Sequence, residues 1–138
     1  MSSSWGDIDI STLSTDPVVL PEGNKYTFKL NKGARFSPFK EGRIDAGATV
    51  AEGDYKGTQV YFSYPDPKEQ PWVLGVFARM QKALGLKAEA GEDPVTYLNR
   101  AAGNQFIAPV KHRNVTVDGV EGKKAEINIG NVTPVPAA

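Results

Sequence analysis

Apolar and polar residues alternate along two stretches of the chain, which is the period-two pattern of a strand with one buried face. In Lys25–Leu30 every second residue is apolar from Tyr26 onward, and in Thr58–Tyr64 the same holds from Val60 onward. The second stretch is also rich in β-branched and aromatic residues, which favours a strand. Weaker patterns predict three further strands, at Ile44–Glu52, Gln105–Val117 and Lys124–Ile129.

Proline and glycine mark the ends of these elements. Pro109 predicts a break or bulge inside Gln105–Val117, because proline cannot donate a backbone hydrogen bond. Asp118-Gly119, which follows that strand, is typical of a tight hairpin turn. Gly53–Gly57 predicts a turn between the second and third strands.

Pro71–Leu86 has the one clear helical period in the chain. Its apolar stripe consists of residues spaced by three or four: Val73, Phe77, Met80 and Leu84, with Leu74 and Val76 beside them. Pro71 suits the first turn, and Gly85 suits a left-handed cap. Gly75 lies inside the helix, where glycine is unfavourable, and we expect another backbone to approach it closely.

A second, shorter helix is predicted for Pro94–Ala102. Asp93 can cap its first turn, and Gly103 can end it. Three strands, then helices, then two strands is the element order of a five-stranded Greek-key barrel capped by a helix, the OB-fold. We therefore expect a mainly β protein with helices (α+β) of that kind. Its expected parts are an acidic flexible segment at 1–21, a domain at 22–134 and a tail at 135–138.

Composition and charge narrow the range of possible functions. The chain has 138 residues, no cysteine and a formal net charge of zero, so disulfides and thiolate metal sites are excluded. No apolar run is long enough to cross a bilayer and no signal peptide is recognisable, so we expect a cytoplasmic protein without membrane contact. Residues 1–22 carry four acids and no Lys or Arg, whereas residues 23–64 carry seven bases against four acids. The charge is therefore sorted along the chain.

Signals for catalysis are weak. His112 lies between Lys111 and Arg113, and no Ser or Asp is spaced as its partner. No phosphate loop, dinucleotide fingerprint or zinc signature is present. We expect no enzyme activity, no cofactor and no metal.

Bases and aromatic residues are interleaved between Lys25 and Arg43, a combination that suits single-stranded nucleic acid. Cations pair with phosphates, and flat rings stack on unpaired bases regardless of sequence. In the OB-fold, the loop after the first strand, here Asn31–Gly42, contributes to oligonucleotide binding. The candidate nucleic-acid-binding residues are Lys25, Lys29, Lys32, Arg35, Phe36, Phe39, Lys40, Arg43, Tyr61, Lys111, His112 and Arg113.

Several segments resemble a family of small bacteriophage proteins from replication and recombination modules. The similar segments are LPEGNKYTF, EGDYKGTQVYFSYP, LGLKA after the helix, AGNQFIAPVKHRNV and INIGNVTPV, within Leu20–Pro134. The resemblance implies an OB-like single-stranded DNA-binding protein that coats strands as a homo-oligomer in the bacterial host cytoplasm. It also implies an acidic tail that contacts replication or recombination proteins. Here the acidic segment is N-terminal, and the end TPVPAA carries no carboxylate side chain.

The sequence thus predicts a non-catalytic, sequence-tolerant single-stranded DNA-binding protein, with RNA binding left open. The alternative is a structural or adaptor protein, such as a virion or assembly component, that uses the same loop as a protein interface. Net neutrality favours that alternative, because many nucleic-acid-binding domains are plainly basic.

Overall fold

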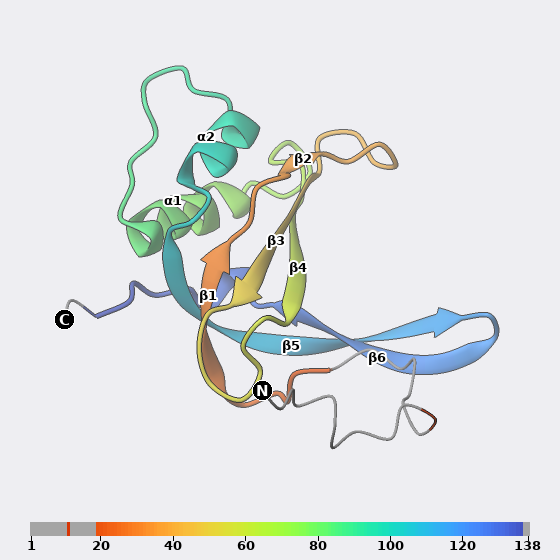
Figure 1. The fold of residues 1–138 in the computed structure, drawn as a ribbon. Helices are drawn as coiled ribbons and strands as arrows, with labels where there is room; N and C mark the ends of the chain where they lie inside the picture. Colours follow the sequence, from red (N-terminus) through yellow and green to blue (C-terminus); the bar gives the residue numbers. More distant parts are fainter. Residues whose placement is uncertain (1–10, 12–18, 137–138) are drawn as a thin grey trace.

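The structure is a computed structural model that describes Ser11 and residues 19–136. Most of the acidic segment expected at 1–21, and part of the tail at 135–138, lie outside the described residues. The described elements follow in the order β1 (Lys25–Leu30), β2 (Arg35–Phe36), β3 (Ile44–Val50), β4 (Gln59–Tyr64), α1 (Val73–Leu84), α2 (Pro94–Ala101), β5 (Gln105–Val117), β6 (Val120–Ile127) and the 3₁₀ helix η3 (Ile129–Asn131) (Figure 1).

Five of the six strands form a closed ring. β1 pairs with β3 and β5, β5 pairs with β6, β4 pairs with β3, and all four pairings are antiparallel. The ring closes through a parallel contact of β4 with β6 at Tyr61 and Glu126. The short β2, which the sequence pattern did not reveal, pairs with the first residues of β3 on the edge opposite β4. The predicted class, mainly β with helices, is confirmed at this level.

The inward faces of the strands and one stripe of each helix form a single core. On β4 the alternation is strict, with Val60, Phe62 and Tyr64 buried and the residues between them exposed. Both helices lie together at one end of the ring (Figure 1). There the rings of Tyr64 and Phe77 meet at 5.1 Å between centroids, which joins β4 to α1.

Leu20, before β1, is also fully buried in this core. Its carbonyl lies 2.6 Å from Nε2 of His112 on β5. The other ring nitrogen of His112, Nδ1, lies 3.1 Å from a carboxylate oxygen of Glu22. The imidazole therefore attaches the chain before β1 to the ring.

The helix expected at Pro71–Leu86 is present but shorter. Trp72 is the N-cap, so Pro71 precedes the helix, and its predicted first-turn position is wrong. Gly85 is left-handed, with φ of 68°, and its N–H donates to the carbonyls of Gln81 and Lys82, as predicted. Most of the predicted stripe is buried, but Leu74 is 63% exposed. The close backbone approach expected at Gly75 is wrong, because a side chain there would meet open space.

Asp93 caps α2 as predicted, since its side chain accepts hydrogen bonds from the N–H groups of Val95 and Thr96. Pro109 neither breaks nor bulges β5: the strand is continuous, with Pro109 paired with Lys25 and Val110 paired with Ile127. Proline is tolerated where the partner of β5 changes from β1 to β6.

Asp118 and Gly119 form the predicted hairpin turn, with φ of 53° and 77°. Of the described β6 residues, only Glu126 pairs with β4, so the distal part of the β5–β6 hairpin, which precedes Glu126 on β6, reaches past the ring (Figure 1). This hairpin forms one wall of the site described below.

Gly75 and Gly85 predict opposite effects of the same substitution. Gly75→Ala should raise the free energy of unfolding by about 1 kcal/mol, because alanine is the better helix former and nothing obstructs its methyl group. Gly85→Ala should lower it by about 1–2 kcal/mol, because alanine is strained at a positive φ. Urea denaturation of the two variants measures both changes, and a loss of stability in Gly75→Ala would contradict the open environment of that residue.

Candidate nucleic-acid interface

A groove of about 640 Å³ crosses the outward face of the ring. Its floor is formed by the outward side chains of β3 and β4, where Asp45 pairs with Ser63 and Gly47 pairs with Tyr61. The segment that leads into β2 forms one side, and the β5–β6 hairpin forms the other. The groove is lined by Asn31, Lys32, Gly33, Arg35, Arg43, Asp45, Ala46, Gly47, Gln59, Tyr61, Phe62, Ser63, Arg113, Lys124 and Glu126.

Tyr61 is the tyrosine that lines the groove. Its side chain is 51% exposed, whereas its neighbours on β4, Val60 and Phe62, are buried. The hydroxyl donates to Oε1 of Gln59 at 3.0 Å. The ammonium of Lys124 lies over the ring, 5.5 Å from its centroid. The groove thus presents one oriented aromatic ring with a cation beside it.

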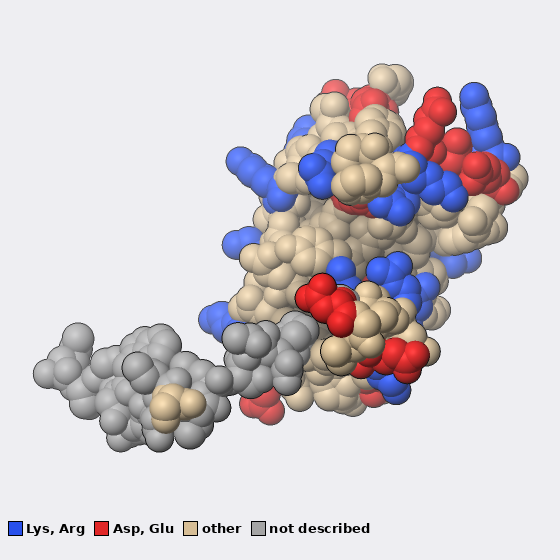
Figure 2. Space-filling view, turned by 90° about the vertical axis from the view of Figure 1, so that its right-hand side faces the viewer, with Lys and Arg blue, Asp and Glu red and all other residues tan. Residues whose placement is uncertain are grey.

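Five cations line the groove against two carboxylates. Asp45 accepts from Nε of Arg43 at 2.9 Å, and Glu126 accepts from Nε of Arg113 at 3.0 Å. Among the residues that the structure describes, no carboxylate pairs with Lys32 or Arg35. In Figure 2, Lys and Arg side chains border a hollow between the loop after β2 and the β5–β6 hairpin. The groove therefore keeps a positive excess although the whole chain is neutral.

Asp45 holds the floor of the groove together. Besides Arg43, it accepts a hydrogen bond from the hydroxyl of Ser63 at 2.9 Å. Partial burial raises the pKa of Asp45, but the hydrogen bonds from Arg43 and Ser63 outweigh it and leave the pKa below its ordinary value. The carboxylate stays ionised and fixes the guanidinium of Arg43 in one position.

Asn99 of α2 fixes the side of the groove that is formed by the segment leading into β2. Its Oδ1 accepts from the N–H groups of Gly33 and Ala34, at 2.8 and 3.1 Å. Its Nδ2 donates to the carbonyl of Ala34 at 3.0 Å. This side-chain amide holds the backbone between Lys32 and Arg35, and so determines where those two cations lie.

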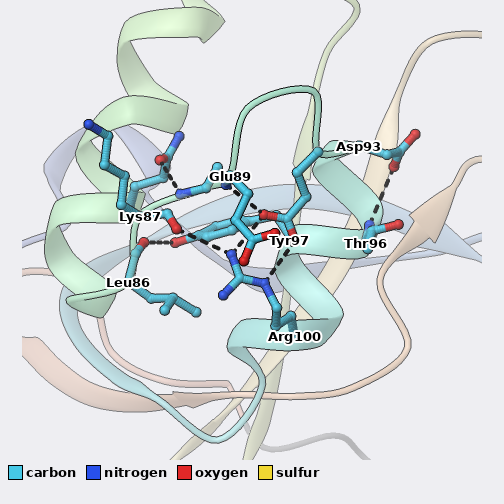
Figure 3. A network of polar contacts seen from close by, with 10 residues as sticks. Leu86, Lys87, Glu89, Asp93, Thr96, Tyr97 and Arg100 are labelled. Atoms are coloured by element: carbon cyan, nitrogen blue, oxygen red, sulfur yellow. Dashed lines mark hydrogen bonds and ion pairs between the residues drawn. The ribbon is translucent and has the colours of Figure 1, made fainter.

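A polar network holds α2 and the connection from α1 in place (Figure 3). Glu92 forms a bidentate pair with Arg100, with Nη2 and Nε donating at 2.7 and 2.8 Å. Arg100 also donates to the carbonyl of Lys87 at 3.2 Å. Burial raises the pKa of Tyr97 to about 12, so its hydroxyl stays protonated and donates to the carbonyl of Leu86.

The structure brings five of the twelve candidate residues into the groove: Lys32, Arg35, Arg43, Tyr61 and Arg113. Lys111 pairs with Glu126 on the same outward face, next to the groove lining. Lys29 is also exposed on the outside of the ring, where it pairs with Thr49.

The remaining candidates lie elsewhere. Lys25 borders a separate depression with Glu52 and Asp54. Phe36 follows Arg35 directly in β2, so its side chain points to the opposite face of the sheet. Phe39 is 87% exposed outside the groove lining, and Lys40 pairs with Glu69 at 3.6 Å. His112 is turned to Leu20 and Glu22.

Sequence reasoning missed several groove residues. Lys124 could have been found, because a two-residue turn at Asp118-Gly119 places it opposite Arg113. The positions of Gly47 and Gln59 in the groove, and of Asn99, which supports one side of it, depend on pairings and contacts between distant segments, for which the sequence pattern carries no signal.

No protein-family model, no curated protein and no solved structure matches this chain. Among the described residues, neither helix has the length and hydrophobicity needed to cross a bilayer. Across the same part of the chain, no three His, Asp or Glu side chains are grouped so that they could hold a metal ion. Any function assigned to the protein therefore depends on the geometry of the groove.

Asn99→Ala should loosen one side of the groove. The amides of Gly33 and Ala34 lose their acceptor, so their hydrogen exchange should accelerate, whereas the amides of β4 should keep their protection. Exchange followed by NMR measures both sites in one experiment. Unchanged protection at Gly33 and Ala34 would show that the segment is held without Asn99.

The Glu92–Arg100 pair predicts a pH dependence of stability. The hydrogen bonds from Arg100, together with one from the N–H of Glu89, lower the pKa of Glu92 from 4.5 to about 2. The stabilising effect of the pair is therefore complete above pH 4.5 and is lost as the pH falls towards 2.

Urea denaturation at several pH values can test this dependence. Glu92→Gln should be less stable than the wild type at neutral pH, and the difference should shrink as the pH falls through that range. Glu121→Gln on exposed β6 serves as the control. A difference that stays constant down to pH 2 would contradict the lowered pKa.

Proposed function

We propose that the protein is a non-catalytic, sequence-tolerant single-stranded DNA-binding protein and that the groove is its binding site. The observation that supports this most directly is the half-exposed ring of Tyr61 among five cations and only two carboxylates. Cations can follow the phosphates, and the ring can stack on an unpaired base. A base in a duplex offers no free face to such a ring, so the site favours single strands.

We further propose that the closed ring is an OB-fold barrel. Its chain order supports this: three ring strands, a helical segment and two more strands, with β3 and β4 as the second and third strands of the ring. In OB-folds, that face and the loops after the first and fourth strands bind oligonucleotides. Here the corresponding parts are the floor of the groove and the groove-lining residues of the segment 31–43 and of the β5–β6 hairpin.

The resemblance to phage replication proteins agrees with this proposal. It extends the proposal to replication or recombination in a bacterial host cytoplasm, with a homo-oligomer and other replication proteins as partners. RNA could use the same cations and the same ring.

A second candidate is an adaptor function, supported by apolar side chains that are exposed outside the groove. Phe39 is 87%, Trp72 is 54% and Leu74 is 63% exposed. Large exposed apolar residues are frequent at protein interfaces. If this candidate is correct, large assemblies should form without nucleic acid.

Charge reversal inside and outside the groove can test the proposal. The groove variant combines Lys32→Glu with Arg35→Glu, and the control combines Lys25→Glu with Lys40→Glu, which changes the net charge equally. Labelled oligo-dT and a duplex of equal length are titrated at two salt concentrations by fluorescence anisotropy.

The wild type should prefer the single strand, and the groove variant should lose at least tenfold in affinity for oligo-dT. Its slope of log affinity against log salt should fall by about 1.4, which is 0.7 for each lost phosphate contact. The control should keep both the affinity and the slope within about twofold. Absence of oligo-dT binding by the wild type at low salt would refute the proposal, and equal losses in both variants would refute the groove as the site.

A further inference from the structure

Gly47 lies on β3 directly opposite Tyr61 on β4, and both face the groove. A Cβ atom at position 47 would lie 3.0 Å from Cδ1 and 3.1 Å from Cε1 of the Tyr61 ring. Those distances are shorter than normal van der Waals contact, so a Cβ atom at position 47 would shift the ring by a few tenths of an ångström, and a branched side chain would shift it further. One edge of the ring therefore occupies the space that a side chain would fill.

The backbone does not require glycine at this position. Gly47 is not among the residues with positive φ, so an ordinary residue could adopt its conformation. Glycine in the middle of a strand also weakens the strand, because it lacks a side chain to pack. Among the described residues, the contact with Tyr61 is thus the feature that calls for glycine at residue 47.

Two further contacts determine the pose of the ring. Gln59 accepts the hydrogen bond of the Tyr61 hydroxyl, and the ammonium of Lys124 lies over the ring at 5.5 Å from its centroid. Because residue 47 is glycine, the aromatic ring of Tyr61 can lie across β3. Gln59 fixes the hydroxyl end of that ring, and Lys124 occupies the place that a stacked base would take.

We infer that Gly47 is a positioning residue for a single-nucleobase subsite on Tyr61, and that the arriving base displaces Lys124 from the ring to a neighbouring phosphate. This inference rests on the proposed function and adds to it the residue that permits stacking. In the free protein Lys124 covers the ring through a cation–π contact; in the complex its charge pairs with the strand.

The variants that test Gly47 are Gly47→Val, Tyr61→Ala and the double variant, with Gly75→Val as the matched control. Gly75 on α1 also lacks a positive φ, a side chain there would meet open space, and it is not part of the groove lining. Affinities for an oligo-dT of about 12 nucleotides are measured by anisotropy, a length within the usual site size of one such domain.

Gly47→Val and Tyr61→Ala should each weaken binding roughly 5- to 150-fold, which is the effect of losing one stacked base. The double variant should be no weaker than Tyr61→Ala alone, because both changes remove the same stack. Gly75→Val should bind like the wild type. Equal affinities for Gly47→Val and Gly75→Val, or independent losses in the double variant, would overturn the inference.

Folding of each variant is checked by circular dichroism and thermal unfolding. If Gly47→Val does not fold, Gly47→Ala replaces it, and the readout becomes the yield of photo-crosslinking between Tyr61 and an oligonucleotide that carries 5-iodouracil. The yield should fall in Gly47→Ala, and an unchanged yield would overturn the inference. If the wild type binds no oligonucleotide, the proposed function itself fails, which is a different result from both of these.

The displacement of Lys124 has its own test. Lys124→Met should lower the slope of log affinity against log salt by about 0.7, the effect of one lost phosphate contact, while crosslinking at Tyr61 persists. Lys123→Met is the control, because Lys123 precedes it on the opposite face of the hairpin and is not part of the groove lining. A slope that does not differ between the two variants would refute the displacement.

Discussion

The double pairing of β1 is the constraint on which the rest of the structure depends. Phe28 is fully buried and lies between Val50 on β3 and Phe106 on β5, and its ring stacks on that of Phe106 at 5.6 Å between centroids. Because β1 pairs with both β3 and β5, the strands form a closed ring around a single core. Without this closure, β3 and β5 would be open edges and the apolar side chains between them would face water.

Closure also creates the outer surface on which the groove lies. In each strand the residues that alternate with the core residues must point outward. On β4 the same alternation that buries Val60 and Phe62 exposes Tyr61 between them. The parallel pairing of Tyr61 with Glu126 then brings the cations of the β5–β6 hairpin close to the aromatic ring of Tyr61. The same strand pairings therefore form both the core and the proposed site.

Local features of the fold were predictable, whereas long-range features were not. The strands at Lys25–Leu30 and Thr58–Tyr64, the Asp93 cap and the Asp118-Gly119 turn each depend on neighbouring residues, and the structure confirms them. The environment of Gly75 depends on what packs against the helix, and that prediction was wrong. Phe36 and Phe39 fit a basic-aromatic pattern in sequence, yet the direction of β2 and its following loop keeps them out of the groove.

The neutral net charge of the chain is compatible with the proposed site because its carboxylates have a structural role. Asp45 and Glu126 each hold one guanidinium, of Arg43 and Arg113, in a fixed position. Such pairing reduces the attraction for phosphate but also removes the entropy cost of ordering two long side chains on binding. In the part of the chain that the structure describes, no carboxylate pairs with Lys32 or Arg35, so in the proposed site these two cations would supply the attraction. Under the proposed function, a groove with cations of both kinds would bind a strand and still release it.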